Sequence, residues 1–393
     1  MTEPHFLDTA SPAFSTRSDE VRAARAAHWC ARTPYGVAVL SHREVGRLLR
    51  DRRLRQGSHS WPDRHGMTGA FADFWSRSVI GREGPQHKTL RRLANDALSP
   101  AFVESLAPQF DAAADRLAAA LGLDIEFMAD FASAFSGHAI TALLNIDDDR
   151  WREVCSDASD LGLAMGVECK RHEARVNAAC ERLTALAAEL AQRARTGGDD
   201  GGYVARLVQR FDAAEDVGET ELLDMIVISI FGGVDTTRSL LGNAMTLFAA
   251  APDQWARLRA NPALAPATVE EAIRAYPTTT WATREALEDF EHEGVAIKRG
   301  ETLHLFVHAS ARDPAICGDP HFDIEADRKA HFGFGGGAHH CLGHQMARTD
   351  MAAALRSLAQ RIESFEISGE AEYLPDSGNT GPVRLPLRLT FAD

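Results

Sequence analysis

Apolar residues recur at helical spacing through most of this chain, and strand-like alternation is confined to shorter stretches. The segment 101–196 is rich in alanine and leucine and predicts several consecutive helices. One long helix is expected from about Glu219 to Ala250, and at 1.5 Å per residue it would span roughly 48 Å. The pattern therefore predicts a mainly α fold with a smaller β portion.

The shorter elements are expected around this helical part. The pattern predicts a helix over residues 19–33, a strand over 35–40 and a hairpin over 294–301, and short strands follow from Ile362 onward. Residues 56–82 are irregular and glycine-containing but carry large aromatic side chains. These could form a binding loop or lid, or they could pack beneath the loop as a small cluster. The aromatic residues are Trp61, Phe71, Phe74 and Trp75.

Composition narrows the class of protein. The 393 residues are 45% hydrophobic and 25% charged, and no low-complexity linker divides them, so a single globular domain over 1–393 is expected. A formal net charge of −14 argues against a nucleic-acid-binding protein. No signal peptide and no apolar run of about 18 residues is evident, which favours a cytoplasmic protein without a membrane span. The six cysteines show no CxxC spacing, so neither a disulfide framework nor a zinc ribbon is indicated.

A glycine-rich stretch at 334–343 reads FGGGAHHCLG. Helical spacing begins directly after it, so Cys341 is expected at a helix N-terminus, where free N–H groups would stabilise a thiolate suited to a metal ion. The glycines would let a flat ligand lie against the backbone. The stretch could instead be a simple turn or an anion site. It could also hold zinc through His339, His340, Cys341 and His344.

Two further groups combine polar residues at helical spacing. His87 and Arg91 lie four residues apart and could clamp a carboxylate, or they could belong to a solvated basic face. Glu271 and Arg274 lie three residues apart and can form an ion pair. A capping box that begins at Thr268 would also explain Glu271.

The centre of the long helix is unusually polar and small, reading FGGVDTT over 231–237. Glycine costs about 1 kcal/mol in a helix interior, and threonine hydroxyls compete for backbone carbonyls. These residues predict a local widening or kink, a feature often found at functional sites. The paired glycines could alternatively serve close helix packing.

Together these segments resemble the cytochromes P450. The loop at 334–343 is similar to the haem-binding loop of that family, and the matching segments at 87–91, 232–236, 271–274 and 284 follow in the family's order. The resemblance implies the P450 fold, bound haem b and O2-dependent insertion of one oxygen atom into a small organic substrate. The aromatic residues of the 56–82 segment and Trp281 suggest that this substrate is largely apolar. Electrons would come from an external partner, expected to be a small acidic ferredoxin with its ferredoxin reductase.

The resemblance also implies roles for individual residues. Cys341 would bind the iron, Phe334 would shield its sulfur, and Gly343 would let backbone N–H groups point at it. Haem propionates would bind four residues, namely His87, Arg91, Arg284 and His339. Gly232 would open a groove above the iron, Thr236 would donate a hydrogen bond during O2 activation, and Asp235 would gate proton delivery.

The remaining roles are structural or concern recognition. Glu271 and Arg274 would hold the loop behind the cysteine as a buried pair. Substrate contacts are tentatively assigned to Phe231, Thr279, Thr280 and Trp281. The ferredoxin is expected to dock on a face that carries Arg91, Arg92, His344 and Arg348.

Four other functions stay open. The same haem could drive oxidative coupling or ring closure, or it could use peroxide in place of O2. The protein could also be a non-enzymatic haem carrier or electron-transfer protein, or a zinc-binding protein.

Overall fold

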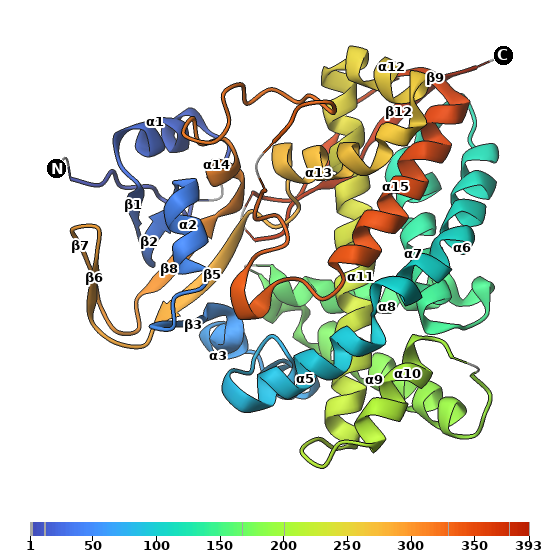
Figure 1. Cartoon of the computed structure of the whole chain (residues 1–393), viewed down its shortest axis with the longest axis horizontal. Coiled ribbons are helices and arrows are strands. Elements are labelled where there is room, and N and C mark those ends of the chain that lie inside the picture. Colours follow the sequence, from blue (N-terminus) through green and yellow to red (C-terminus); the bar gives the residue numbers. More distant parts are fainter. Residues whose placement is uncertain are drawn as a thin grey trace.

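The computed structural model describes residues 3–11, 13–166, 168–199, 201–328, 330–376 and 378–392. It is mainly helical with a smaller β portion to one side, as predicted (Figure 1). The helices are α1 (Asp19–Ala27), α2 (His42–Leu48), α3 (Trp61–Arg64), α4 (Ala70–Arg77), α5 (Gly84–Ala97), α6 (Pro100–Ala119), α7 (Ser133–Leu144), α8 (Trp151–Gly162), α9 (Glu173–Arg195), α10 (Tyr203–Asp212), α11 (Glu219–Ala250), α12 (Pro252–Ala260), α13 (Ala265–Ala275), α14 (Val307–Ala311) and α15 (His344–Arg361). The strands are β1 (Cys30–Thr33), β2 (Gly36–Val39), β3 (Leu54–Gln56), β4 (Asp124–Glu126), β5 (Trp281–Ala286), β6 (Phe290–His292), β7 (Val295–Ile297), β8 (Thr302–Phe306), β9 (Ile362–Ile367), β10 (Glu372–Tyr373), β11 (Pro382–Arg384) and β12 (Pro386–Phe391).

Helix α11 has the predicted bounds and runs through the helical part, in contact with α7, α8, α9 and α15 (Figure 1). It is long and apolar enough to cross a membrane by length and mean hydropathy, contrary to the sequence-based expectation, but 61% of its most apolar window is buried by its neighbours. Its apolar residues therefore belong to the protein core. The helix continues without a break through its polar centre, where the Thr236 hydroxyl donates to the Gly232 carbonyl at 2.6 Å within the helix.

The main sheet has the strand order β1-β2-β8-β5-β3, in which β2 and β8 are parallel and the other neighbours are antiparallel. The helix predicted over 19–33 ends early, because Cys30–Thr33 instead pairs with Gly36–Val39. This pairing buries Cys30 and Ala31 beneath the sheet, and such tertiary burial overrides a modest helix propensity. The hairpin predicted over 294–301 is displaced towards the N-terminus and joins β6 to β7.

The segment predicted as an irregular loop at 56–82 contains α3 and α4. Phe71, Phe74 and Trp75 are almost fully buried and join the main helical core, so the packing interpretation of these aromatic residues is the correct one. The regular spacing of Phe71 and Trp75 along one face of α4 is the signal that the glycines on either side obscured.

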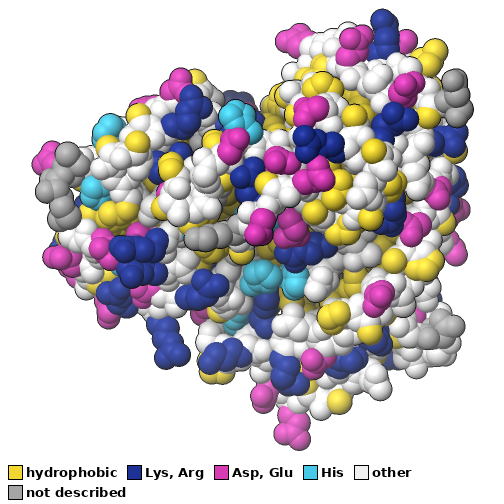
Figure 2. Space-filling view, turned by 45° about the horizontal axis from the view of Figure 1, so that its top comes forward, with side chains coloured by type: hydrophobic (Ala, Val, Ile, Leu, Met, Phe, Trp, Pro, Cys, Tyr) yellow, Lys and Arg dark blue, Asp and Glu magenta, His cyan; other side chains and the backbone are white. Residues whose placement is uncertain are grey.

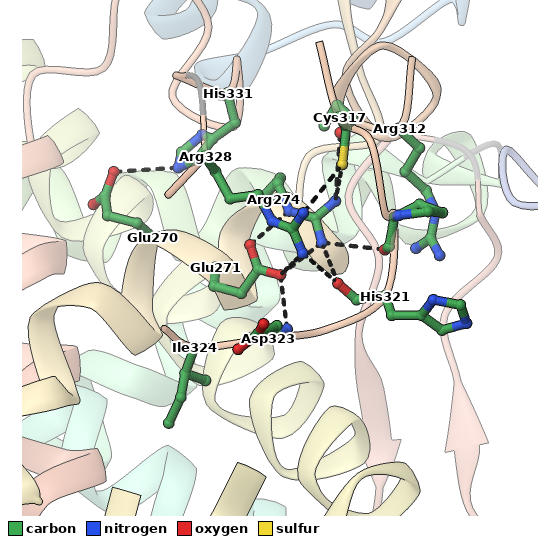
Figure 3. A network of polar contacts seen from close by, with 12 residues as sticks. Glu270, Glu271, Arg274, Arg312, Cys317, His321, Asp323, Ile324, Arg328 and His331 are labelled. Atoms are coloured by element: carbon green, nitrogen blue, oxygen red, sulfur yellow. Dashed lines mark hydrogen bonds and ion pairs between the residues drawn. The ribbon is translucent and has the colours of Figure 1, made fainter. Parts of the chain in front are cut away.

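A buried ion pair fastens the segment that leads to Cys341 (Figure 3). Arg274 Nε and Nη2 donate to Glu271 Oε2 and Oε1 at 2.6 and 2.7 Å, and both side chains are less than 5% exposed. Arg274 also donates to the carbonyls of Pro320 and His321, while Glu271 accepts from the Asp323 N–H at 3.0 Å. The pair therefore binds residues 320–323 to α13.

The capping box predicted at Thr268 is wrong. Helix α13 begins at Ala265, so Thr268 lies inside the helix and is fully buried. Pro266 in the first turn explains the earlier start, because its fixed φ and missing N–H suit that position.

We expect Arg274→Ala to lower the free energy of unfolding by about 3–5 kcal/mol, because it leaves the Glu271 carboxylate buried without its partner. The matched control is Arg257→Ala. Arg257 pairs with Glu325 at 2.7 Å on the surface, where both side chains are 49% exposed, and the expected loss there is about 0–1 kcal/mol. Urea denaturation measures both values, and equal losses would contradict a special role for the buried pair.

Candidate active site

The loop that carries Cys341 is packed tightly against the β portion of the molecule. Gly337 has φ +69°, and a Cβ at this position would lie 2.3 Å from the Leu49 carbonyl oxygen, so the site requires glycine. The Cys341 N–H donates to the Phe334 carbonyl at 2.9 Å and closes the loop. The Arg348 guanidinium covers the Phe334 ring at 4.5 Å.

Cys341 lies in the loop just before helix α15. Helix α15 begins at His344 with Gly343 as its N-cap, so Cys341, predicted at the helix N-terminus, lies two residues before the N-cap. Burial raises the pKa of the Cys341 thiol, although the Gly343 N–H and the charges of Arg91 and Arg348 act in the opposite direction. The expectation that the helix end alone would stabilise a thiolate is therefore corrected: an electrophilic ligand such as a metal ion would have to displace the proton. As a residue Cys341 is nevertheless exposed, unlike the other five cysteines, so part of it can be reached from solvent although protein atoms crowd the thiol.

Two guanidinium groups lie beside this loop, that of Arg284 buried and that of Arg91 half-buried. Arg284 on β5 is 5% exposed and donates to Gln56 Oε1 at 3.2 Å and to the Gly336 carbonyl. Arg91 on α5 donates to the His340 carbonyl. Neither guanidinium forms an ion pair with a carboxylate within the described ranges, and burial lowers the pKa of both. These are two concentrated positive charges positioned to receive an anion.

Two histidines complete the same cluster. The His87 and His339 rings stack with centroids 4.2 Å apart. His87 Nε2 is buried and finds no hydrogen-bond partner among the described residues, and burial lowers the pKa of His87 to about 4. His339 Nε2 lies 2.9 Å from Glu83 Oε1. Burial acts to raise the pKa of the Glu83 carboxyl group. Hydrogen bonds from His339 and the Gln56 N–H outweigh this effect and hold the pKa of Glu83 at about 2.

The centre of α11 presents a second wall. Gly232 is exposed although it lies in the middle of a core helix, and a Cβ there would meet no atom within 4 Å. Asp235 pairs with Arg238 Nη2 at 3.1 Å and accepts from the Ser159 hydroxyl at 3.3 Å. Burial raises the pKa of Asp235, against the opposing effects of Arg238 and Ser159.

The residues predicted to contact substrate fall into three places. Phe231 is partly buried and its ring meets Trp75 edge-on at 6.5 Å. The hydroxyls of Thr279 and Thr280 bond to Asn379 and Gly378 in the C-terminal turn. The Trp281 ring instead stacks on His304 and Phe306, within the small core formed with the N-terminal segment.

Strand geometry explains this separation. Side chains alternate between the two faces of a strand, so Trp281 lies on the opposite face of β5 from Arg284, whereas Thr280 precedes Arg284 by an even number of residues. The role of Thr280 as a substrate contact remains a prediction.

Hydrogen bonds join two segments that are distant in the sequence. The Trp61 indole donates to the Ala164 carbonyl at 2.7 Å, the Thr68 N–H donates to Glu173 at 2.7 Å, and the Phe71 N–H donates to Asn177 at 2.9 Å. These bonds tie the region of α3 and α4 to the segment after α8 and to the first turns of α9.

The predicted zinc set is not brought together. Within the described ranges, the group with three donor atoms within 4.8 Å of one another is Glu83, His87 and His339, which excludes Cys341. Sequence reasoning missed Glu83, Gln56, Ser159 and Arg238, and the first three reach the site through contacts that no local spacing reveals. Only Arg238 carried a signal, as it follows Asp235 by three residues on a helix.

The haem expected from the sequence resemblance fits these residues. An exposed cysteine can bind iron, and two arginines without carboxylate partners, one buried and one half-buried, match two propionates. The unpartnered His87 nitrogen adds a further hydrogen-bonding group on the same side. A flat ring needs close approach to backbone, which the bare surface at Gly232 allows.

Comparison with known proteins agrees with this assignment. Residues 260–389 match the family model described as Cytochrome P450. The chain is 34% identical to the luteothin monooxygenase of Streptomyces thioluteus over 396 residues, which covers 98% of this chain and 96% of that protein. The crystal structure of CalO2 superimposes with a TM-score of 0.85 at 26% identity, covering 97% of this chain and 99% of that one. CxnD, a cytochrome P450 for C–S bond formation in chuangxinmycin biosynthesis, matches with a TM-score of 0.83 at 26% identity over 99% and 98% of the two chains.

A relative with this degree of identity over nearly the whole length establishes the family, and the structural matches extend it to the whole fold. The chain belongs to the cytochrome P450 family, and it is a monooxygenase that uses haem b and electrons from a redox partner to oxidise a small organic molecule.

Proposed function

We propose that Cys341 holds the haem iron and that Arg91, Arg284, His87 and His339 bind the two propionates. The observation that carries this assignment is the pair of guanidinium groups without carboxylate partners, Arg284 buried and Arg91 half-buried, beside an exposed cysteine. Phe334 would shield the sulfur, and the Gly343 N–H would donate to it. The bound haem supplies O2 activation and oxidation, while the protein supplies position, electrostatics and control of water.

The proton-handling residues are Asp235 and Thr236. A carboxyl group whose pKa is raised by burial exchanges protons closer to neutral pH, which suits it to general acid–base work. The Thr236 hydroxyl donates to the Gly232 carbonyl and keeps its oxygen lone pairs available to accept a proton from a neighbouring donor. Gly232 would leave room for O2 and water beside this hydroxyl.

The substrate is a small, largely apolar molecule that would contact Phe231, Thr279 and Thr280, with Trp281 as a more remote candidate. Because the similar CxnD acts in chuangxinmycin biosynthesis, we infer that natural-product intermediates are the first class to screen. Its C–S bond formation also favours oxidative coupling as the second candidate reaction.

The electron donor is a small acidic ferredoxin, which its reductase supplies with electrons. The protein works in the cytoplasm, and residues 1–393 act as one haem domain. Figure 2 supports a basic docking face, since Lys and Arg side chains surround a group of histidines on one side of this acidic protein. Lys88 and Arg92 are exposed on α5, and Arg50 is exposed next to Leu49, where the Cys341 loop packs. Arg348 suits docking less well than expected, because it forms a two-pronged ion pair with Glu270 at 2.6 and 3.1 Å.

The reduced, CO-bound absorption spectrum of the purified protein tests haem–thiolate ligation. We expect a Soret band at the position that gives the family its name, and Cys341→Ser should abolish it. The matched control, Cys30→Ala, removes a buried thiol from β1 and should keep the band. A band typical of histidine ligation in the unaltered chain would overturn the assignment of Cys341.

Asp235→Asn and Thr236→Ala should each lower O2-dependent product formation by about 10²-fold, because each removes a group that passes protons. The substrate would be the compound that gives the largest spin-state shift in a spectral screen. Thr246→Ala is the control, since Thr246 makes the same hydrogen bond to the carbonyl four residues earlier on α11 at 2.9 Å. Equal activity in all four proteins would show that this pair has no catalytic role.

The double change Arg50→Glu and Arg92→Glu should slow haem reduction by ferredoxin at least tenfold at low salt, with a smaller effect at high salt, because surface charges steer association. Arg361→Glu makes the same kind of change on an exposed residue at the far end of α15, roughly 27 Å along the helix from its start. Stopped-flow reduction measures all three proteins, and a loss shared equally by the control would leave the proposed face without support.

A further inference from the structure

A cavity of about 220 Å³ lies between α7, α8 and α11, and the proposed active site does not use it. All the residues that line it belong to these three helices. Arg152 and Ser156 lie in its wall and are exposed, so the cavity opens to solvent. A small molecule could therefore enter it without passing the Cys341 loop.

One wall of the cavity is apolar and closely packed. Trp151, Cys155 and Val234 form it. A Cβ at Gly137 on α7 would lie 2.7 Å from the Trp151 ring and 2.8 Å from the Cys155 sulfur, so these two side chains occupy the space that a larger residue on α7 would fill. A cavity of about 150 Å³ can hold a benzene molecule. This larger cavity therefore has space for an aromatic ring that carries one polar substituent.

The polar part of the lining is positively charged. It holds two guanidinium groups and, among the described residues, no carboxylate. Arg238 pairs with Asp235 at 3.1 Å through Nη2, but its Nε is buried and has no hydrogen-bond partner in the part of the chain described. Arg152 forms no ion pair within the described ranges, and its guanidinium lies 4.5 Å from the centre of the Trp151 ring. Since Asp235 balances one of the two charges, one positive charge is left over, and this suits a monoanion.

Helix α11 separates this cavity from the proposed haem. Val234 and Arg238 line the cavity and lie four residues apart, on one face. Gly232 and Thr236 also lie four residues apart, and at 100° per residue their face is turned away from the first by roughly 160°. A ligand in the cavity should therefore leave the haem spectrum unchanged.

We propose that this cavity binds a small aromatic carboxylate, with its ring against Trp151 and its carboxylate between Arg152 and Arg238. The Arg238 Nε–H donates to one carboxylate oxygen, and the Arg152 guanidinium donates to the other. An apolar wall with a few convergent polar groups is the usual composition of a small-molecule site. The inference does not depend on the roles proposed for Cys341 or Asp235.

The bound carboxylate contacts three helices at once. It is bound without covalent chemistry, and it joins α8 to α11 through groups that otherwise have no partner on the cavity side. A ligand that binds the folded chain alone stabilises it in proportion to the logarithm of its concentration. The site therefore lets an aromatic acid act on the protein from outside the haem pocket.

The first experiment measures the affinity of the holoenzyme for benzoate by isothermal titration calorimetry. Arg152→Ala should weaken binding about tenfold, because it removes a charge-assisted hydrogen bond. Arg238→Lys keeps the charge beside Asp235 but removes the Nε donor, and it should weaken binding similarly. The matched control is Arg150→Ala. Arg150 precedes Arg152 by two residues, pairs with Glu189 at 3.0 Å and does not line the cavity, so the affinity should not change. Equal affinity in all four proteins would overturn the proposal.

Two other probes test the class of ligand. Benzyl alcohol has the ring without the charge, and inorganic phosphate has the charge without the ring. Both should bind at least tenfold more weakly than benzoate. If benzyl alcohol binds as tightly as benzoate, the guanidinium groups do not select the ligand. If phosphate does so, the apolar wall does not select it. Either result would refute an aromatic carboxylate as the ligand.

The second experiment locates the bound benzoate in the holoenzyme. Cys155 lies in the cavity wall and is 9% exposed, so methyl methanethiosulfonate can be used to label it, with peptide mass spectrometry as the readout. Benzoate at roughly ten times its dissociation constant should slow this labelling about tenfold, because only the empty cavity admits the reagent. Labelling of Cys180, which is 1% exposed on α9, should not change. Unprotected Cys155, or a Soret shift with the same midpoint as the calorimetric titration, would place benzoate elsewhere and overturn the proposal.

Discussion

Positive charge held inside the molecule without a matching carboxylate is the constraint on which the site depends. Removing a guanidinium from water costs several kcal/mol unless a partner compensates, yet Arg284 and Arg91 have only neutral oxygen acceptors in the part of the chain described. They reach the same region from β5 and α5, which belong to the β and helical portions respectively. The tight approach of Gly337 to Leu49 brings these two portions together. The fold therefore prepares a cationic wall that a dianionic cofactor would neutralise.

The second wall requires a core helix to carry polar groups at its centre. Helix α11 manages this by satisfying each group locally: Thr236 bonds within the helix, and Asp235 bonds to Arg238 and Ser159. Because these needs are met on the helix or on α8, the helix stays regular where its sequence suggested distortion. Small and polar residues at this point thus leave accessible backbone without breaking the hydrogen-bond ladder.

The sequence predicted the parts of the fold that depend on local spacing, and the family resemblance supplied the rest of the site. Helix α11 could be predicted with its bounds, because a long apolar period is a strong signal. Strand β1 could not, since its pairing with β2 is decided by burial beneath a sheet assembled from distant segments. Two other features also depend on neighbours far away in the sequence. One is the side of β5 on which Trp281 lies, and the other is the carboxylate that Arg348 binds. The pKa of Cys341 is another such case, because burial raises it more than the groups at the start of α15 lower it. Burial depends on all the segments that surround the sulfur, and local spacing does not reveal them.

The hydrogen bonds between residues 61–71 and residues 164–177 have a consequence for local stability. Because Trp61 is bound to Ala164 and Thr68 is bound to Glu173, neither segment can move outward alone without breaking bonds to the other. Each such bond contributes only about 1 kcal/mol, so the two segments are held together by the number of these bonds and not by any single one.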